Sequence, residues 1–425
     1  MRPVSVALLF MTPSASIVEP VRRVGVIGPG LMGLGIAQAV AAAGIHVVLC
    51  GRDAAAAHAG RERLEGTLRR QVARGRLDAA AEAAILAHVG AASVTADALA
   101  GCDLIIESVP EDRAVKTATL SLIERAAPAA ILATNTSGLS ISGLAEALRE
   151  PSRFLGLHFF SPAERMRLVE VVSGPRTSSA ALASAIGFAR AIGKRPIAVR
   201  DGPGFFTTGV FAAYLDEAVA MVAEGVSPAA IDEAATANGR ALGPLAVLDE
   251  TGVALNLAQA RQARADGLEA RFCRALAEPV LAVLVAAGRA GRRAGGGFFD
   301  WPAEKPRTPW SGLAAAFPPA AKPPEREQIR LRLFAAEARE ALRRLEDGIV
   351  ASADDVDTAS VLGLGYSKQI GGVLREAEDF GLEALVSLCD GFASRYGERF
   401  APSPWLRALA ARDQGLRAYR KQDGA

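Results

Sequence analysis

Short apolar runs alternate with helix-forming stretches over the first half of the chain. The runs are four to six residues long and rich in β-branched residues, which predicts buried strands. They are Val24–Ile27, Val47–Cys50, Leu104–Val109, Ile131–Thr134, Phe154–Phe159, Arg167–Val172 and Pro196–Arg200. Because helix-forming sequence such as Leu31–Ala43 separates most of them, the pattern predicts a parallel sheet with crossover helices.

Two helix-forming blocks follow, and they share a pattern. The first runs to about Arg289 and the second from about Glu325 to Tyr419, with a Gly/Pro-rich stretch between them. "YLDEAVAMVAEGVSPAAIDEA" (214–234) aligns with "AAEAREALRRLEDGIVASADDVDTA" (335–359), and each block then has two glycines nine residues apart. Chance similarity between alanine-rich helices is the alternative, but the matched turn residues favour a duplication.

Composition limits the class of protein. The 425 residues allow two or three domains. A net charge of +2, spread along the chain, argues against a nucleic-acid binder. No apolar run reaches the ~18 residues that span a bilayer. The four cysteines form no CxxC and, with only four histidines, argue against a metal site and favour a cytoplasmic location. Residues 1–21 predict a leader or linker; a signal peptide, which they faintly resemble, is the alternative.

The stretch "GPGLMG" is a GxGxxG motif between a predicted strand and a predicted helix. Gly28 permits a tight turn, Gly30 lets a pyrophosphate approach the backbone, and Gly33 lets helix and strand pack closely. The start of the helix then presents free N–H groups to the phosphates. The motif predicts a nicotinamide dinucleotide, with Leu31 and Met32 also beside it.

The end of the second strand departs from this pattern. An acid that binds the ribose of NAD usually stands there, but "VVLCGRD" has Gly51, then Arg52 and Asp53. Arg52 could pair with the 2′-phosphate of NADP. Asp53 could instead turn back to the ribose of NAD. Both residues are cofactor-binding candidates, and NAD is expected with NADP possible.

These patterns together predict a fold class and its domains. We expect an α/β Rossmann-type domain over residues 22–200, followed by two related all-α domains. The first helical domain is expected over 201–300 and its duplicate over 325–425, with a linker over 301–324.

His158 and Glu170 are the candidates for acid–base chemistry. His158 lies near the end of one predicted strand, and a short connector leads into "MRLVEVV", where Glu170 interrupts an apolar strand. Strands joined in this way can lie antiparallel and place the two side chains opposite each other. A carboxylate on one imidazole nitrogen makes the other a better base. A buried pair with only a structural role is the alternative.

"ATNTSGLSIS" (133–142) follows another buried strand. Asn135, Thr136 and Ser137 could donate hydrogen bonds to a ligand at the carboxyl edge of the sheet. Ser140 or Ser142 could cap a following helix instead, and both roles are compatible.

The chain resembles a known family at several motifs. "GPGLMGLGIAQAVAAAG", "IIESVPEDRAVK", "ILATNTSGLSIS", "GLHFFSPAERMRLVEVV", "DGPGFFTT" and "GRRAGGGFF" have the order and spacing of the L-3-hydroxyacyl-CoA dehydrogenases, over about residues 22–420. The second helical block resembles the last part of the multifunctional fatty-acid oxidation α subunits. The chain is therefore expected to match their dehydrogenase half, without the hydratase half.

The resemblance implies roles for particular residues. His158 matches the family's general base, Glu170 its partner, and Ser137 the serine that touches the substrate oxygen. Glu111 and Lys116 match positions near the nicotinamide and the substrate.

It also implies a substrate site. Ser161 and Thr208 stand where simpler two-domain members have Asn and are expected to contact the substrate. Gly209 departs from the usual Arg and puts local packing or a substrate contact in doubt. "GRERLEGTLRRQVARGR" (60–76) matches a basic helical stretch that contacts CoA in the family, with Arg61 and Arg69 as candidates. A solvated charged face is the alternative.

The expected activity is the interconversion of (S)-3-hydroxyacyl-CoA and 3-ketoacyl-CoA in fatty-acid β-oxidation. An NADPH-linked biosynthetic reductase of a 3-ketoacyl thioester is a second possibility, and a non-catalytic scaffold with the same fold is a third. A homodimer and a separate hydratase or thiolase partner are also expected.

Overall fold

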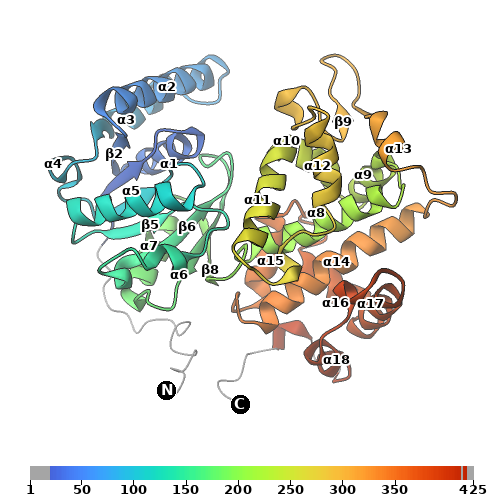
Figure 1. The fold of residues 1–425 in the computed structure, drawn as a ribbon. Helices are drawn as coiled ribbons and strands as arrows, with labels where there is room; N and C mark the ends of the chain where they lie inside the picture. The colour runs from blue at the N-terminus through green and yellow to red at the C-terminus, as the bar shows by residue number, and fades with distance from the viewer. Residues whose placement is uncertain (1–19, 413–414, 419–425) are drawn as a thin grey trace. The chain divides into compact units, whose positions relative to one another are not determined.

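The computed structural model describes residues 20–412 and 415–418. It divides into two compact units (Figure 1). Of the described residues, the first unit takes those up to Phe205 and the segment Gly348–Ala351, and the second takes the rest. The predicted leader lies outside the described residues except for Pro20 and Val21. Within these ranges no helix is long and apolar enough to cross a membrane.

An eight-stranded sheet is the centre of the first unit. The strand order is β3-β2-β1-β4-β5-β6-β7-β8, and every neighbouring pair is parallel except β6 and β7. The strands are β1 (Arg23–Ile27), β2 (His46–Gly51), β3 (Val89–Ser93), β4 (Leu104–Glu107), β5 (Ile131–Thr134), β6 (Phe154–Phe159), β7 (Leu168–Ser173) and β8 (Arg195–Arg200).

The seven strands predicted from apolar runs all form, most within one residue of the expected bounds. The strand expected over Leu104–Val109 is shorter and ends at Glu107. β3 was not predicted, because "VGAAS" contains a single β-branched residue and lies at the edge of the sheet. The sheet is nonetheless largely parallel, as the alternation of strands and helices indicates.

Helices of the first unit form two groups. Residues of α1, α2, α3 and α7 share one hydrophobic core with the strands, whereas α5 and α6 contact β4, β5 and β6 outside that core. The helices are α1 (Leu31–Ala42), α2 (Ala54–Ala73), α3 (Ala79–Ala87), α4 (Ala96–Leu99), α5 (Arg113–Ala126), α6 (Ile141–Ala145) and α7 (Ser179–Ala191), with a 3₁₀ turn at Pro151–Arg153.

The second unit is almost entirely helical. Its helices are α8 (Thr207–Ala223), α9 (Pro228–Ala237), α10 (Pro244–Thr251), α11 (Val253–Ala265), α12 (Glu278–Ala286), α13 (Gly312–Ala316), α14 (Arg326–Glu346), α15 (Ala353–Gly363), α16 (Val373–Phe380), α17 (Leu382–Tyr396) and α18 (Pro404–Ala410). β9 (Phe299–Asp300) pairs antiparallel with β10 (Thr308–Pro309), and both β10 and α13 lie within the stretch 301–324 that was expected to be a linker. The described part of this unit also has 3₁₀ turns at Ala270–Phe272, Arg292–Ala294, Glu398–Phe400 and Leu416–Ala418.

The two helical blocks contain the same polar arrangement. Asp232 on α9 accepts hydrogen bonds from two backbone N–H groups at the start of α10 and from Arg307. Asp357 on α15 accepts from two N–H groups at the start of α16 and from Arg417. In both blocks, a Cβ atom on the glycine that precedes the helix would collide with the aspartate.

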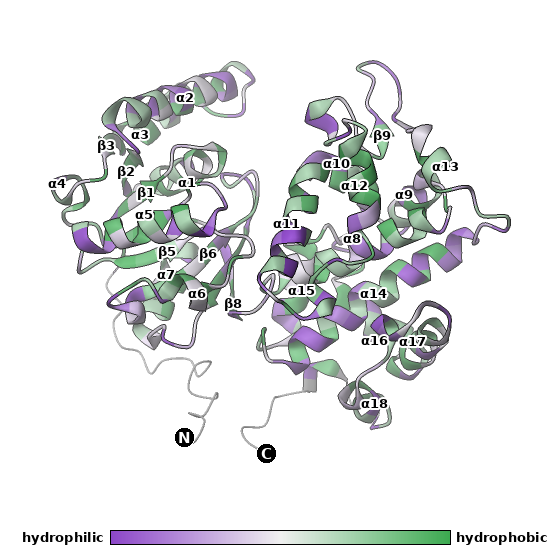
Figure 2. Ribbon diagram, in the orientation of Figure 1, coloured by the Kyte–Doolittle hydropathy of each residue, from purple (hydrophilic) through white to green (hydrophobic). Residues whose placement is uncertain are grey.

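Helices α8 and α14 join the two blocks. Hydrophilic and hydrophobic residues alternate along α14 (Figure 2), and Arg332 on it donates to Glu217 and Glu224 of α8. Arg344, also on α14, places its guanidinium so close to Gly209 that a Cβ atom there would lie 2.1 Å from a guanidinium nitrogen. The glycine at this unusual position therefore makes room for a side chain of the second block.

Gly348–Ala351, which we call the return segment, links the C-terminal part of the chain to the sheet. It leaves α14 and runs along β8, where Val350 forms an antiparallel bridge with Val199. The backbone N–H of Arg200 donates to the Ile349 carbonyl at 2.8 Å, and its guanidinium donates to the Gly348 carbonyl at 2.5 Å. The α/β unit is thus completed by residues that follow the first helical block.

A fragment of residues 20–320 should be poorly soluble or inactive. Truncation removes α14, which exposes the apolar face of α8, and also the return segment. Soluble yield and turnover of the fragment test this, with a chain that starts at residue 20 and keeps its C-terminal part as the control. A soluble fragment with full activity would contradict it.

Candidate active site

His158 and Glu170 lie directly opposite each other on neighbouring strands. β6 and β7 are antiparallel, and their register pairs His158 with Glu170. Leu157 and Phe159 point into the core shared with α1 and α7, so His158, between them, points to the other face of the sheet. The antiparallel arrangement expected from the short connector is confirmed.

The two side chains form one short hydrogen bond. The Nδ1 atom of His158 lies 2.6 Å from Oε2 of Glu170, and the two residues are 6% and 0% exposed. Within the described ranges, Nε2 of His158 makes no hydrogen bond. A carboxylate on Nδ1 favours the tautomer with its proton there, which leaves the Nε2 lone pair for a substrate proton.

The segment after β5 lies beside the histidine. The Asn135 side-chain oxygen accepts the backbone N–H of Phe159 at 2.9 Å, which fixes the strand end next to His158. The backbone N–H of Ser137 donates to Glu111 at 3.0 Å, and the Thr136 hydroxyl donates to the same oxygen. Ser140 caps α6 through the Gly143 N–H, so the capping role is confirmed.

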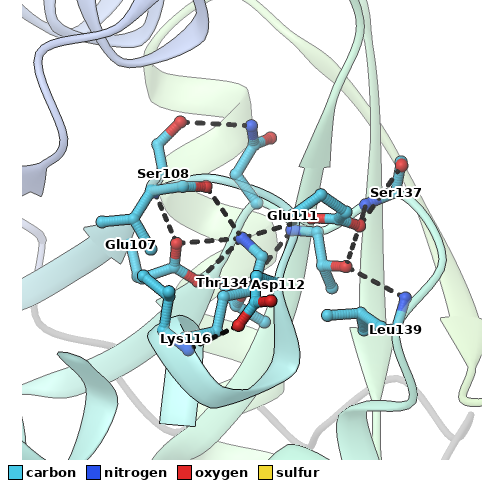
Figure 3. A network of polar contacts seen from close by, with 12 residues as sticks. Glu107, Ser108, Glu111, Asp112, Lys116, Thr134, Ser137 and Leu139 are labelled. Carbon is cyan, nitrogen blue, oxygen red and sulfur yellow. Dashed lines mark hydrogen bonds and ion pairs between the residues drawn. The ribbon is translucent and has the colours of Figure 1, made fainter. Parts of the chain in front are cut away.

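A buried ion network supports Glu111 (Figure 3). Lys116, only 1% exposed, contacts Glu107 at 2.9 Å and Glu111 at 3.3 Å. Glu107 also accepts the Thr134 hydroxyl at 2.6 Å. The buried ammonium group of Lys116 therefore holds the carboxylate of Glu111 in place, and Lys116 itself is not exposed at the surface. Glu107 was not predicted, because its partners are set by the pairing of β4 with β5 and by the first turn of α5.

The glycine motif has the geometry that phosphate binding requires. Gly28 has φ +108°, and a Cβ atom there would lie 2.5 Å from the Ser108 carbonyl oxygen. A Cβ atom on Gly33 would collide with the Gly28 carbonyl, whereas nothing lies within 4 Å of one on Gly30. Helix α1 starts after Gly30 with no side-chain cap and no acid in its first turn, so its N–H groups remain available to an anion. Leu31, 66% exposed, and Met32 lie in that first turn.

The end of β2 has no acid that points to a ribose. Gly51 is its last residue, and a Cβ atom there would lie 2.6 Å from the Ala57 backbone nitrogen. Asp53 is the N-cap of α2 and accepts the Ala56 N–H at 2.7 Å. The Arg52 side chain is 90% exposed and its Nε lies 3.3 Å from Asp53. The carboxylate of Asp53 thus already accepts a hydrogen bond from the start of α2.

The predicted substrate contacts lie in different units. Ser161 is exposed at the start of the β6–β7 connector, three residues beyond His158. Thr208 lies in the first turn of α8, in the second unit. Both roles stay predictions.

The arginines predicted to contact CoA have partners within the protein, and their role toward CoA stays a prediction. Arg61 donates to the carbonyls of Val89 and Leu86 and so links α2 to β3 and α3. Arg69 pairs with Glu65 and Glu82. A cavity of about 420 Å³ lies along the same helix; among the residues that line it are Thr67, Arg70, Gln71, Arg74, Arg76 and Arg165. The run of arginines in the sequence indicated this helix, but it did not indicate which of the arginines line the cavity.

Comparison with known proteins agrees with the motifs. The profile of the 3-hydroxyacyl-CoA dehydrogenase NAD binding domain matches residues 23–202, and that of the C-terminal domain matches residues 204–301. The fatty acid oxidation complex subunit alpha of Vibrio vulnificus is 36% identical over 319 residues, which is 75% of this chain. The chain spans only 44% of the length of that relative.

Solved structures give the same result. The 3-hydroxybutyryl-CoA dehydrogenase of Escherichia coli K12 superposes with a TM-score of 0.81 at 28% identity, over 93% of this chain and 99% of that one. The (S)-3-hydroxybutyryl-CoA dehydrogenase of Ralstonia eutropha is 32% identical, with a TM-score of 0.62 over 66% of this chain and 99% of that one. The chain thus shares both matched domains with enzymes of one kind, and it belongs to the 3-hydroxyacyl-CoA dehydrogenase family.

Proposed function

We propose that this chain interconverts (S)-3-hydroxyacyl-CoA and 3-ketoacyl-CoA in fatty-acid β-oxidation. The observation that carries the proposal is the pair of His158 and Glu170, 2.6 Å apart, with Nε2 of the imidazole not engaged. Relatives over both matched domains include 3-hydroxybutyryl-CoA dehydrogenases and fatty acid oxidation complex subunits. These names support the substrate class.

The residues of the site divide the work. Nε2 of His158 removes the proton of the 3-hydroxyl group, and Glu170 stabilises the imidazolium that results. The Ser137 hydroxyl orients the substrate oxygen, and Glu111, held by Lys116, keeps the Ser137 backbone in place. In the reductive direction His158 returns the proton to the same oxygen.

The glycine loop fits a nicotinamide dinucleotide. The open space at Gly30 and the uncapped start of α1 are suited to its pyrophosphate. When bound, the cofactor accepts or donates the hydride at C3 of the substrate. Asn135 and Glu111, near the carboxyl end of the sheet, are proposed to contact its nicotinamide end.

The cofactor preference is proposed to be relaxed, with NADP(H) accepted beside NAD(H). Without an acid at position 51, the last residue of β2 carries no charge that would repel a 2′-phosphate, and the nearby carboxylate of Asp53 is held by the start of α2 and by Arg52. The exposed guanidinium of Arg52 is free to swing toward such a phosphate. Asp53 favours this account over ribose binding, because it already caps α2.

The CoA phosphates are proposed to bind the arginine-lined cavity. Arg70, Arg74, Arg76 and Arg165 bring four cations to one hollow, with Glu164 as an acid in its lining. Guanidinium groups suit phosphate because they donate paired hydrogen bonds.

The two helical blocks are proposed to be copies of one ancestral domain. The matched aspartates, Asp232 and Asp357, support this, since each ties its helix to the start of the next. The boundaries 201–300 and 325–425 stay a prediction, as do the homodimer, the cytoplasmic location and a separate hydratase or thiolase.

The two alternatives can be separated by one assay. A scaffold would give no cofactor-dependent absorbance change with acetoacetyl-CoA or a longer 3-ketoacyl-CoA. A biosynthetic reductase would show kcat/KM with NADPH far above that with NADH.

Replacement of His158 by Ala should lower kcat by ~10²–10⁴, the usual effect of losing a positioned base, with little change in cofactor affinity. Steady-state kinetics and cofactor titration measure the two effects. His88→Ala, which removes a half-buried histidine of the same unit, is the control and should keep its activity. A His158→Ala enzyme that retained more than about a tenth of kcat would refute the assignment.

Replacement of Arg52 by Ala should lower kcat/KM with NADPH by about 5–30-fold, since a charge-assisted contact at an exposed site is worth ~1–2 kcal/mol. The value with NADH should change less than about twofold, because Arg52 is not expected to contact the unphosphorylated ribose. Arg125→Ala, which removes an exposed arginine in the last turn of α5, is the control.

Either of two results would contradict the proposed role of Arg52 in the use of NADP(H). Wild-type enzyme could show no turnover with NADPH. Alternatively, Asp53→Ser, which keeps an N-cap side chain but removes the carboxylate, could sharply weaken NADH binding and so identify Asp53 as the ribose ligand. Gly51→Asp is not a useful test, because its side chain would collide with the backbone of α2.

A further inference from the structure

Phe205 has an unusual backbone conformation. Its φ is +48°, and it is fully buried. Among the described residues other than glycine, only Phe205 and Arg274 have positive φ. An L-residue as large as Phe is disfavoured there because its Cβ crowds the backbone. Such strain persists only where surrounding structure enforces it, often at functional sites.

The segment before Phe205 is held at several points. The Asp201 carboxylate accepts the N–H groups of Ile141 and Ser142, at 3.0 and 2.7 Å, and its own N–H donates to the Ser173 carbonyl at 2.9 Å. The Phe205 N–H then donates to the Gly202 carbonyl at 2.9 Å, which closes a tight turn. These bonds leave the turn little freedom to relieve the strain.

The return segment closes the other side of this turn. A Cβ atom on Gly202 would lie 2.9 Å from Cδ1 of Ile349, so the Ile349 side chain packs closely over Gly202. Arg200 fixes Ile349 through its backbone N–H. The return segment, about 150 residues further along the chain, therefore packs against the turn that contains Phe205.

The Phe205 ring lies next to the candidate base. Its centroid is 6.0 Å from that of the His158 imidazole, at an interplanar angle of 56°. Phe160 lies 4.6 Å from the same imidazole. Glu170 fixes one atom of the imidazole, Nδ1, but a single hydrogen bond leaves the ring free to tilt about it.

We propose that Phe205 is a positioning residue for His158, and that the return segment holds it in place. The strained turn presses the Phe205 ring against the imidazole. Together with Phe160, the ring fixes the imidazole plane and hence the direction of Nε2. The inference rests on the proposed function, because it takes His158 as the base.

Replacement of Phe205 by Leu tests the proposal. We expect kcat to fall at least tenfold, while KM for acetoacetyl-CoA and for the cofactor stays within about twofold, because small errors in the placement of a reacting group mainly slow the chemical step. Phe188→Leu is the control. Phe188 is a similarly buried phenylalanine of the same unit, on α7. It should lose comparable thermal stability and keep its kcat.

Equal effects of the two substitutions on kcat would overturn the proposal, because Phe205 would then only fill space. If the Phe205→Leu variant does not fold, kcat of the Ile349→Ala variant tests the proposal instead. A several-fold loss of kcat supports the proposal, and wild-type kcat in this folded variant rejects it. Failure of the proposed function is seen separately, as a wild-type enzyme without activity or a His158→Ala enzyme with normal activity.

Discussion

The hydrogen bond between His158 and Glu170 depends on a single reversal in an otherwise parallel sheet. Only an antiparallel pair of strands joined by a short connector sets residues twelve positions apart directly opposite each other. The alternation of the strand fixes the face: Leu157 and Phe159 enter the core, so His158 emerges on the side of the Asn135–Ser137 segment. Glu111, Lys116 and the strained turn at Phe205 then act on groups that this reversal has brought together.

Features set by local periodicity could be predicted from the sequence. Strands that are buried on both faces are continuous apolar runs, and their bounds were predicted to within one or two residues. The glycine motif was recognised because it lies between a strand and a helix. The short connector also indicated that the strands of His158 and Glu170 could lie antiparallel, and the register of β6 and β7 pairs the two residues. β3 was missed because its residues carry almost no strand preference.

Features set by contacts distant in sequence could not be predicted. The sequence gives no sign that Glu107 and Lys116 pair with each other, and only the fold makes them a buried pair. Arg61 belongs to a basic stretch whose charges looked equivalent, yet it binds two carbonyls while Arg74 lines a cavity. The return segment and Phe205 gave no signal, because a positive φ and an added bridge on β8 arise only when both parts of the chain are folded.

The most direct test of this account is the pH profile of kcat for Glu170→Gln beside that of the wild type. If Glu170 stabilises the imidazolium of His158, its removal makes protonation of the base harder, so the acid limb moves to lower pH while maximal kcat falls. Gln keeps the size of the side chain and a hydrogen-bonding oxygen, so packing is little changed. An acid limb at the same pH in both enzymes would show that the pair is structural and that another group removes the proton.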